Sequence, residues 1–178
     1  INATGRMTTP DGKAPRVIQV RKNQNRTFWL MNNGEVYAAG ENSDYGLGNS
    51  ETTDRNYSVR VTANDTQDWQ GNTIGKTFNQ TKMVKVGMSD AGHDSGTSSC
   101  FALGDDGSVW VWGYNNNGQL GLGNPGINNS ADASGGPTST AFYSANVTRP
   151  VRLPQSYFDG RQIIDMWTSG SEEAWFHA

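Results

Sequence analysis

Short apolar stretches alternate with polar, glycine-rich stretches along the whole chain, and no window keeps the 3.6-residue spacing of an amphipathic helix. The pattern is clearest in residues 99–124. An apolar run there is followed by Asp106-Gly107, a second apolar run that ends at Trp112, and a glycine-rich tail. Asp-Gly between two apolar runs is a strong signal for a tight β-hairpin, because both central residues of that turn need positive φ. The pattern therefore predicts two strands joined by a hairpin and followed by a loop.

Residues 26–49 repeat this stretch in a degenerate form. Most equivalent positions match at one constant offset, and Gly-Leu-Gly-Asn closes both copies. Aligning those closing residues implies that the first copy has lost two residues before Gly46, and Ala39 replaces the second tryptophan. The matched pairs are Phe28 with Phe101, Leu30 with Leu103, Asn33-Gly34 with Asp106-Gly107, Val36 with Val109, Gly40 with Gly113, and Asn42 with Asn115. An internal repeat of this kind indicates an architecture of stacked units.

The same pattern places further strands around the two hairpins. Each unit begins with a short apolar strand and ends with a fourth strand, and a third unit is begun near the end of the sequence. The predicted strands are 17–20, 26–31, 35–39 and 57–61 in the first unit, 83–86, 99–104, a return strand ending at Trp112-Gly113, and 149–153 in the second, and 163–166 and 173–178 in the third. Residues 62–82 and 124–148 are predicted to be long loops.

Composition supports an all-β chain and excludes several classes of site. Only 34% of the residues are hydrophobic and 17% are charged, whereas 22 of the 178 are glycine. The net charge of −3 argues against a nucleic-acid-binding surface. Arg16, Arg21, Lys22 and Arg26 form one basic cluster, which we interpret as a solvated strand face. Cys100 is the single cysteine, so neither an intrachain disulfide nor a cysteine-rich zinc site can form.

The second copy resembles the regulator of chromosome condensation repeat. The residues that carry the resemblance are Asp106-Gly107, Val109, Trp110, Trp112-Gly113, Asn115, Gly118-Gln119-Leu120-Gly121 and Gly123. The resemblance implies a β-propeller of about seven four-stranded blades. It divides the chain into a first blade at 17–61, a second at 83–153 and the start of a third at 163–178. Trp29, Trp110 and Trp112 are then expected to fill the space between blades.

Two features depart from what the resemblance implies. Members of the family usually carry a histidine between the first two strands of a blade, but this chain has Arg26, Ser99 and Glu173 at the corresponding positions. A histidine-based property therefore cannot be carried over. Two blades and part of a third also cannot close a ring, so we expect the chain to be a piece of a longer one or to assemble with copies of itself.

No pattern of catalytic, cofactor-binding or metal-binding residues stands out, and we expect a protein that is not an enzyme. The loop at 89–95 gathers His93 with two aspartates, but we favour a polar surface loop because no second histidine is near. The glycines at 118–123 open no helix and precede no Lys-Ser/Thr pair, which a phosphate-binding loop needs. We therefore predict no catalytic residue, no cofactor and no metal.

Partner binding remains, and the non-repeating loops are the candidates for it. Exposed aromatic or charged residues there would either contact a partner or pack on the blade beneath. These residues are Trp69, Phe78, His93, Asp94, Phe142 and Tyr143. The expected partners are a protein, a surface glycan or further blades. Nucleic acid is not expected, and no apolar run is long enough to span a membrane.

Acidic composition, few lysines and long uncharged loops favour a structural or adhesive module in a virion tail fibre or a bacterial surface protein, and thus an extracellular or virion location. Several Asn-x-Ser/Thr triplets agree weakly with that location. The alternative is a cytoplasmic or nuclear regulatory propeller, for which the resemblance implies nucleotide exchange on a small GTPase or chromatin binding. A secreted enzyme inhibitor is a further alternative.

Overall fold

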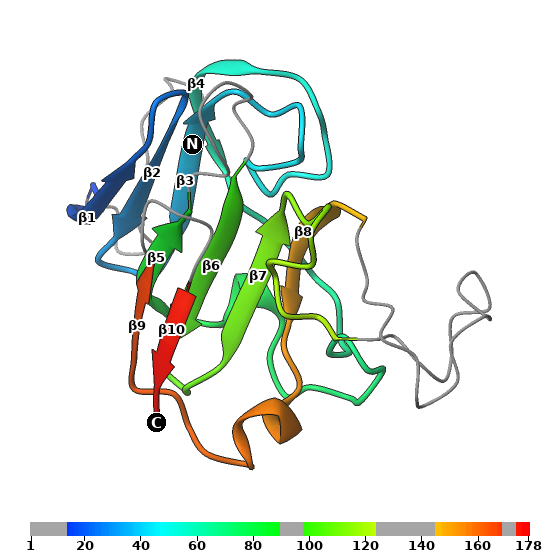
Figure 1. The fold of residues 1–178 in the computed structure, drawn as a ribbon. Helices are drawn as coiled ribbons and strands as arrows, with labels where there is room; N and C mark the ends of the chain where they lie inside the picture. The colour runs from blue at the N-terminus through cyan, green and yellow to red at the C-terminus, as the bar shows by residue number, and fades with distance from the viewer. Residues whose placement is uncertain (1–13, 90–97, 124–144, 169–173) are drawn as a thin grey trace.

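The structure, a computed structural model, describes residues 14–89, 98–123, 145–168 and 174–178 (Figure 1). Its strands form two four-stranded antiparallel sheets and one two-stranded hairpin. The regular helices within these ranges are two short 3-10 turns, η1 (Phe78–Gln80) and η3 (Gln155–Phe158). The prediction of an all-β chain is confirmed. Within the same ranges, no helix has the length and apolarity that crossing a membrane requires.

Each complete sheet is a simple meander that forms one blade. Blade A consists of β1 (Val17–Lys22), β2 (Arg26–Met31), β3 (Val36–Gly40) and β4 (Arg55–Arg60). Blade B consists of β5 (Met83–Met88), β6 (Ser99–Gly104), β7 (Val109–Gly113) and β8 (Val147–Arg152). Blade C is represented by β9 (Asp165–Thr168) and β10 (Ala174–His177). The strands lie within a few residues of their predicted positions, and the largest shift is that of β9.

The two complete blades are built on the same register. Leu30 pairs with Val36 in blade A, and the equivalent Leu103 pairs with Val109 in blade B. The register shifts that mark β-bulges also recur at equivalent places, in the first strand and in the third-to-fourth strand pairing of each blade. The repeat in the sequence is therefore a repeat of backbone geometry.

The hairpin turns at Gly34 and Gly107 place each blade against the start of the next. Both glycines have positive φ, 86° and 76°, but Asn33 and Asp106 do not, so the expectation of positive φ at both central residues is wrong. Gly34 N donates to the Met31 carbonyl and Gly107 N to the Gly104 carbonyl, so each hairpin has a three-residue loop in which only the glycine is left-handed. A Cβ on Gly34 would lie 2.6 Å from the Cα of Lys82, immediately before β5. A Cβ on Gly107 would lie 2.8 Å from the Cβ of Gln162, shortly before β9. Glycine is thus needed at these turns both for backbone conformation and for close approach.

The core lies between blades A and B and is centred on two tryptophans. Trp110 and Trp112 are fully buried. The ring of Phe28 meets Trp112 edge-on at 5.8 Å, and the ring of Phe78 meets Trp110 and Trp112 at 5.5 and 6.0 Å. Edge-to-face packing at these distances is the favoured arrangement of aromatic rings. The expectation that these two tryptophans fill inter-blade space is confirmed.

Trp29 does not share that position. It is only partly buried and pairs across the sheet with Val20 and Tyr37, so it lies on the face of blade A that carries the 51% exposed Val20. The expectation that Trp29 fills the space between blades is wrong for the two blades described. Side chains alternate between the faces of a strand, and Phe28 and Leu30 occupy the buried face.

Figure 1 shows the blades side by side as an open arc, with their first strands β1, β5 and β9 as neighbours. Val86 N donates to the Gln19 side chain at 2.9 Å, and Lys85, equivalent to Gln19, forms an ion pair with Asp165. One position in each first strand therefore links its blade to the next. The chain contributes two four-stranded blades and part of a third to a β-propeller, and the ring is not closed.

Candidate functional site

The glycine-rich loops after β3 and β7 are each organised by one asparagine. Asn42 Oδ1 accepts a hydrogen bond from Leu47 N at 2.9 Å, and Asn115 Oδ1 accepts one from Leu120 N at the same distance. The Asn42 side chain also donates to the carbonyls of Glu51 and Thr53. Both asparagines are fully buried. They satisfy backbone groups that the tight loops would otherwise leave unpaired, so the conspicuous loop motif is a scaffold element.

Hydrogen bonding in these loops corrects the sequence alignment. Leu47 takes the place of Leu120, so the constant offset continues through the loop and the expected loss of two residues before Gly46 is wrong. Left-handed backbone recurs at equivalent positions: Tyr45 (φ 64°) and Gly118 (75°), Gly48 (62°) and Gly121 (66°), and Ser50 (63°) and Gly123 (66°). Aligning the two Gly-Leu-Gly-Asn sequences gives the wrong register, because Tyr45 and Ser50 of blade A occupy the positions of Gly118 and Gly123 in blade B.

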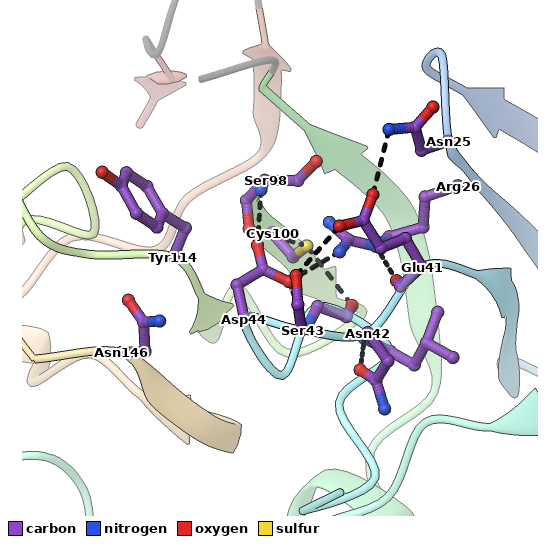
Figure 2. A network of polar contacts seen from close by, with 12 residues as sticks. Asn25, Arg26, Glu41, Asn42, Ser43, Asp44, Ser98, Cys100, Tyr114 and Asn146 are labelled. Carbon is purple, nitrogen blue, oxygen red and sulfur yellow. Dashed lines mark hydrogen bonds and ion pairs between the residues drawn. The ribbon is translucent and has the colours of Figure 1, made fainter. Parts of the chain in front are cut away.

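A buried ion pair joins blade A to blade B. Figure 2 shows the Arg26 guanidinium donating to Asp44 Oδ1 at 2.6 Å, while Asp44 Oδ2 accepts from Ser98 N at 2.6 Å. The two side chains are 0% and 3% exposed. Arg26 Nε also donates to the carbonyl of Glu41 at 2.7 Å. A buried charge is tolerated when it is paired and hydrogen-bonded in this way.

Arg26 contradicts the interpretation of its cluster as a solvated strand face. The other three members of that cluster, Arg16, Arg21 and Lys22, are exposed as expected, but Arg26 is buried at the junction. The physical reason is Asp44, which lies 18 residues later and compensates the charge. One feature of the sequence could have indicated that Arg26 is not a surface residue: it stands where the resemblance implies a histidine.

Gly46 is the meeting point of the same junction. Its carbonyl accepts a hydrogen bond from Trp112 Nε1 at 3.0 Å and a weaker one from the Cys100 thiol at 3.5 Å. A Cβ on Gly46 would lie 2.2 Å from the guanidinium carbon of Arg26. Burial raises the pKa of the Cys100 thiol far above its ordinary value, so this cysteine stays neutral and is not a reactive nucleophile.

The residues predicted to contact a partner differ in their exposure. Phe78 is 4% exposed and packs between Trp110 and Trp112, so it belongs to the core and is not accessible to a partner. Trp69 is half-buried. His93 and Asp94, and likewise Phe142 and Tyr143, lie outside the described residues, as does most of the loop considered as a metal site.

Trp69 lines an open hollow on the connection between the two blades. The hollow has a volume of about 390 Å³ and is bordered by Asn64, Asp65, Thr66, Gln67, Asp68, Trp69 and Val151. Arg149 donates to both carboxylate oxygens of Asp65 at 2.8 Å, and this bidentate contact lowers the pKa of Asp65. Trp69 N donates to the carbonyl of Arg152 on β8 at 2.9 Å, which anchors the loop to blade B.

The described ranges hold no cluster of metal-ligating side chains. No three His, Cys, Asp or Glu side chains gather there as a ligand set. Asp106 accepts hydrogen bonds from the backbone and side chain of Ser108. Burial alone would raise the pKa of Asp106, but these hydrogen bonds overcome that effect and the pKa is lowered. Asp106 therefore acts as a turn residue, as the hairpin predicts.

Residues 106–163 match the family model described as the regulator of chromosome condensation (RCC1) repeat. These residues are an RCC1 repeat. The match begins at the β6–β7 turn of blade B and ends just before β9. The RCC1 repeat thus contains the loop organised by Asn115, and the resemblance noted from the sequence is confirmed.

Solved structures share the fold. Human WBSCR16 is 18% identical with a TM-score of 0.54, covering 86% of this chain and 28% of that one. Prp20p from Saccharomyces cerevisiae is 16% identical with a TM-score of 0.51, covering 93% and 31%. The structure of Kap60 bound to yeast RCC1 (Prp20) matches at 14% identity and a TM-score of 0.53, covering 96% and 34%. The chain spans about a third of these chains or less, and at these identities the likeness concerns the fold alone.

Proposed function

We propose that this chain is a segment of a non-catalytic, protein-binding β-propeller, with blade boundaries at 17–61, 83–153 and 163–178. One observation carries the proposal: the residues of the conspicuous motif serve the scaffold. Asn115 holds its loop, Trp112 closes the junction between blades, and Asp106 shapes a turn. Recognition is then left to surfaces that do not repeat, as is common for loops on a rigid scaffold.

The hollow around Trp69 is the described surface that best suits a partner. It combines a half-buried indole with the carboxylate of Asp68 on a chain of net charge −3, while the carboxylate of Asp65 is already bound by Arg149. Aromatic faces and carboxylates together favour basic side chains. We therefore propose a protein partner with exposed lysine or arginine as the ligand of this surface.

The regulatory alternative gains support from one comparison. Prp20p was crystallised in a study that reports its binding to Gsp1p and histones, and histones are basic proteins of the kind the Trp69 hollow suits. A cytoplasmic or nuclear protein-binding role is accordingly favoured over the virion, adhesive or surface-glycan role. The latter role and its extracellular location rest on composition alone, as does the inhibitor alternative.

Binding and exchange can be measured separately. Biolayer interferometry with the 178-residue chain immobilised should show saturable binding of core histones, weakened about tenfold by Trp69→Ala. Tyr57→Ala, which removes another exposed aromatic side chain, on β4, is the matched control and should leave binding unchanged. Release of fluorescent GDP from Gsp1p should not accelerate.

Two results would contradict the proposal. Saturable acceleration of GDP release by the chain would make it an exchange factor and end the non-catalytic interpretation. Histone binding that Trp69→Ala and Tyr57→Ala weaken equally would remove the Trp69 hollow as the recognition surface.

A further inference from the structure

A small polar pocket lies at the hairpin-turn end of blade A. It is bordered by the β2–β3 turn, the end of β4 and the connection that enters β5, and its volume is about 120 Å³. Its polar lining includes Asn33, Glu35, Arg60, Asn79, Gln80 and Lys82. Every lining residue belongs to blade A or to this connection, so the pocket is formed entirely within residues 14–89.

The carboxylate in this lining is already engaged through both of its oxygens. Glu35 Oε1 pairs with Arg60 Nη2 at 3.1 Å. Glu35 Oε2 accepts hydrogen bonds from Asn33 Nδ2 at 3.0 Å and from the Tyr37 hydroxyl at 3.2 Å. Glu35 therefore positions the guanidinium of Arg60 and has little capacity left to accept a hydrogen bond from a ligand.

Three side-chain amides line the pocket, and the oxygen of each already accepts a backbone N–H. The contacts are Glu35 N to Asn33 Oδ1 at 3.1 Å, Ala63 N to Asn79 Oδ1 at 3.3 Å, and Thr77 N to Gln80 Oε1 at 3.0 Å. The carboxylate and amide acceptors of the pocket are thus largely committed to the protein itself.

The donors of the pocket are not committed to the same extent. In residues 14–89 and the other described ranges, the Lys82 ammonium and the Gln80 side-chain nitrogen have no hydrogen-bond or ion-pair partner. Arg60, 39% exposed, uses one nitrogen on Glu35 and keeps further N–H groups. A site with free donors and occupied acceptors favours a ligand that only accepts hydrogen bonds, such as an anion.

Charge and size narrow the anion to a single carboxylate. Two cations, Arg60 and Lys82, and one carboxylate, Glu35, leave one net positive charge at the pocket. A phosphate monoester carries a charge of about −1.5 to −2 at pH 7 and would be repelled by Glu35. A volume of about 120 Å³ holds about four water molecules at about 30 Å³ each, which is enough for a carboxylate on one or two methylene groups.

Blade B keeps the arginine of this pocket but not its lysine. Arg152 pairs with the third strand of its blade at the place that Arg60 takes in blade A. Gln162 takes the place of Lys82, since each lies against the glycine of a hairpin turn. The positive charge is therefore a feature of the connection between blades A and B and not of the repeat.

We propose that this pocket, which we call the Lys82 pocket, binds a carboxylate of a protein partner through Lys82 and Arg60. The proposal goes beyond the proposed function, because the Trp69 hollow suits a basic side chain. The two sites meet where Asn79 Nδ2 in the pocket donates to Asn64 Oδ1 in the hollow at 2.8 Å. A partner segment that carries a basic and a neighbouring acidic residue can contact both.

NMR titration of the isotope-labelled 178-residue chain at constant ionic strength tests the proposal with three capped amino acids. N-acetylglutamate amide carries a side-chain carboxylate, N-acetylalanine a terminal carboxylate, and N-acetylglutamine amide none. We expect saturable shifts of the Glu35 and Lys82 amide signals with a carboxylate and none with the glutamine compound. The carboxylate that binds more tightly identifies its source as an acidic side chain or a chain terminus.

Variants of two lysines in the same connection provide the control on the protein side. Lys82→Gln should weaken carboxylate binding about tenfold, the loss expected for one charge-assisted contact, whereas Lys82→Arg should retain it. Lys76→Gln removes the same charge from an exposed position outside the lining and should leave the affinity unchanged.

Three results would overturn the proposal. They are the absence of saturable shifts with either carboxylate, equal binding of the glutamine compound, and equal weakening by Lys82→Gln and Lys76→Gln. None of these results affects the histone assay with Trp69→Ala, so the two proposals fail separately.

Discussion

The two junctions between blades differ in how they are completed. The A–B junction is closed by Trp112 and by the buried Arg26–Asp44 pair, and its central side chains are fully buried. The B–C junction keeps the matching lining but leaves a groove above Gly121. Ser99 takes the position of Arg26 there and donates to the Tyr114 carbonyl at 2.8 Å. The comparison teaches that the residues of one blade line a junction and that the third strand of the next blade fills it, as β7 does with Trp112.

The largest expected effect comes from breaking the charge pair of the A–B junction. Arg26→Ala or Asp44→Asn leaves one buried charge without its partner and should lower the free energy of unfolding by about 3–5 kcal/mol. The double change Arg26→Met with Asp44→Leu removes both charges and should cost far less. Urea denaturation followed by tryptophan fluorescence measures all three variants. Single changes as mild as the double change would show that the pair is not electrostatically coupled.

Adding one methyl group distinguishes the two junctions. Gly48→Ala and Gly121→Ala carry the same penalty for a left-handed backbone, about 1–2 kcal/mol. Only Gly48→Ala also collides with Trp112 and with Val61, 2.7 Å away, which should cost about 1–3 kcal/mol more. Thermal unfolding of the pair of variants provides the measurement. Equal losses of stability would mean that the slot above Gly48 is no tighter than the groove above Gly121.

Blade A holds a non-glycine residue where blade B has Gly123. Ser50 is exposed and has a φ of 63°, so Ser50→Gly should relieve backbone strain and raise the free energy of unfolding by up to about 1 kcal/mol. The neighbouring exposed change Glu51→Gly, at a residue without positive φ, is the control and should not stabilise the chain. A lower unfolding midpoint for Ser50→Gly would contradict the strain.

The smallest effect concerns the ion pair beside the Trp69 hollow. Arg149 holds the pKa of Asp65 below its ordinary value of 3.8, so the pair stabilises the fold above that pH, and the contribution is lost as pH falls through the lowered pKa. Both groups are partly exposed, at 45% and 31%, and solvent screening limits the effect to about 0.2–1 kcal/mol. Asp65→Asn should therefore destabilise the chain more at about pH 7 than at about pH 2.5. An equal difference at both pH values would argue against the pair.

Local chemistry explains which predictions hold. The hairpins at Gly34 and Gly107 and the alternation of Phe28 and Leu30 depend on neighbours in sequence, so both follow from the residues alone. The alignment of the loops failed because Tyr45 and Ser50 adopt the backbone that glycine adopts in blade B. The hydrogen bonds of Asn42 and Asn115 therefore define the equivalent loop positions better than the recurring residue types do.

The sequence by itself determined the all-β class, the repeat and the propeller blades, because turn residues and side-chain alternation act over a few positions. Only the tertiary structure decided that Arg26 is buried and that Phe78 belongs to the core. The physical reason is distance along the chain: the contacts that make Arg26 tolerable join residues 18 positions apart, and those that anchor Asp44 to Ser98 span 54. Burial at a junction depends on which blade lies opposite, and no stretch of one blade contains that information.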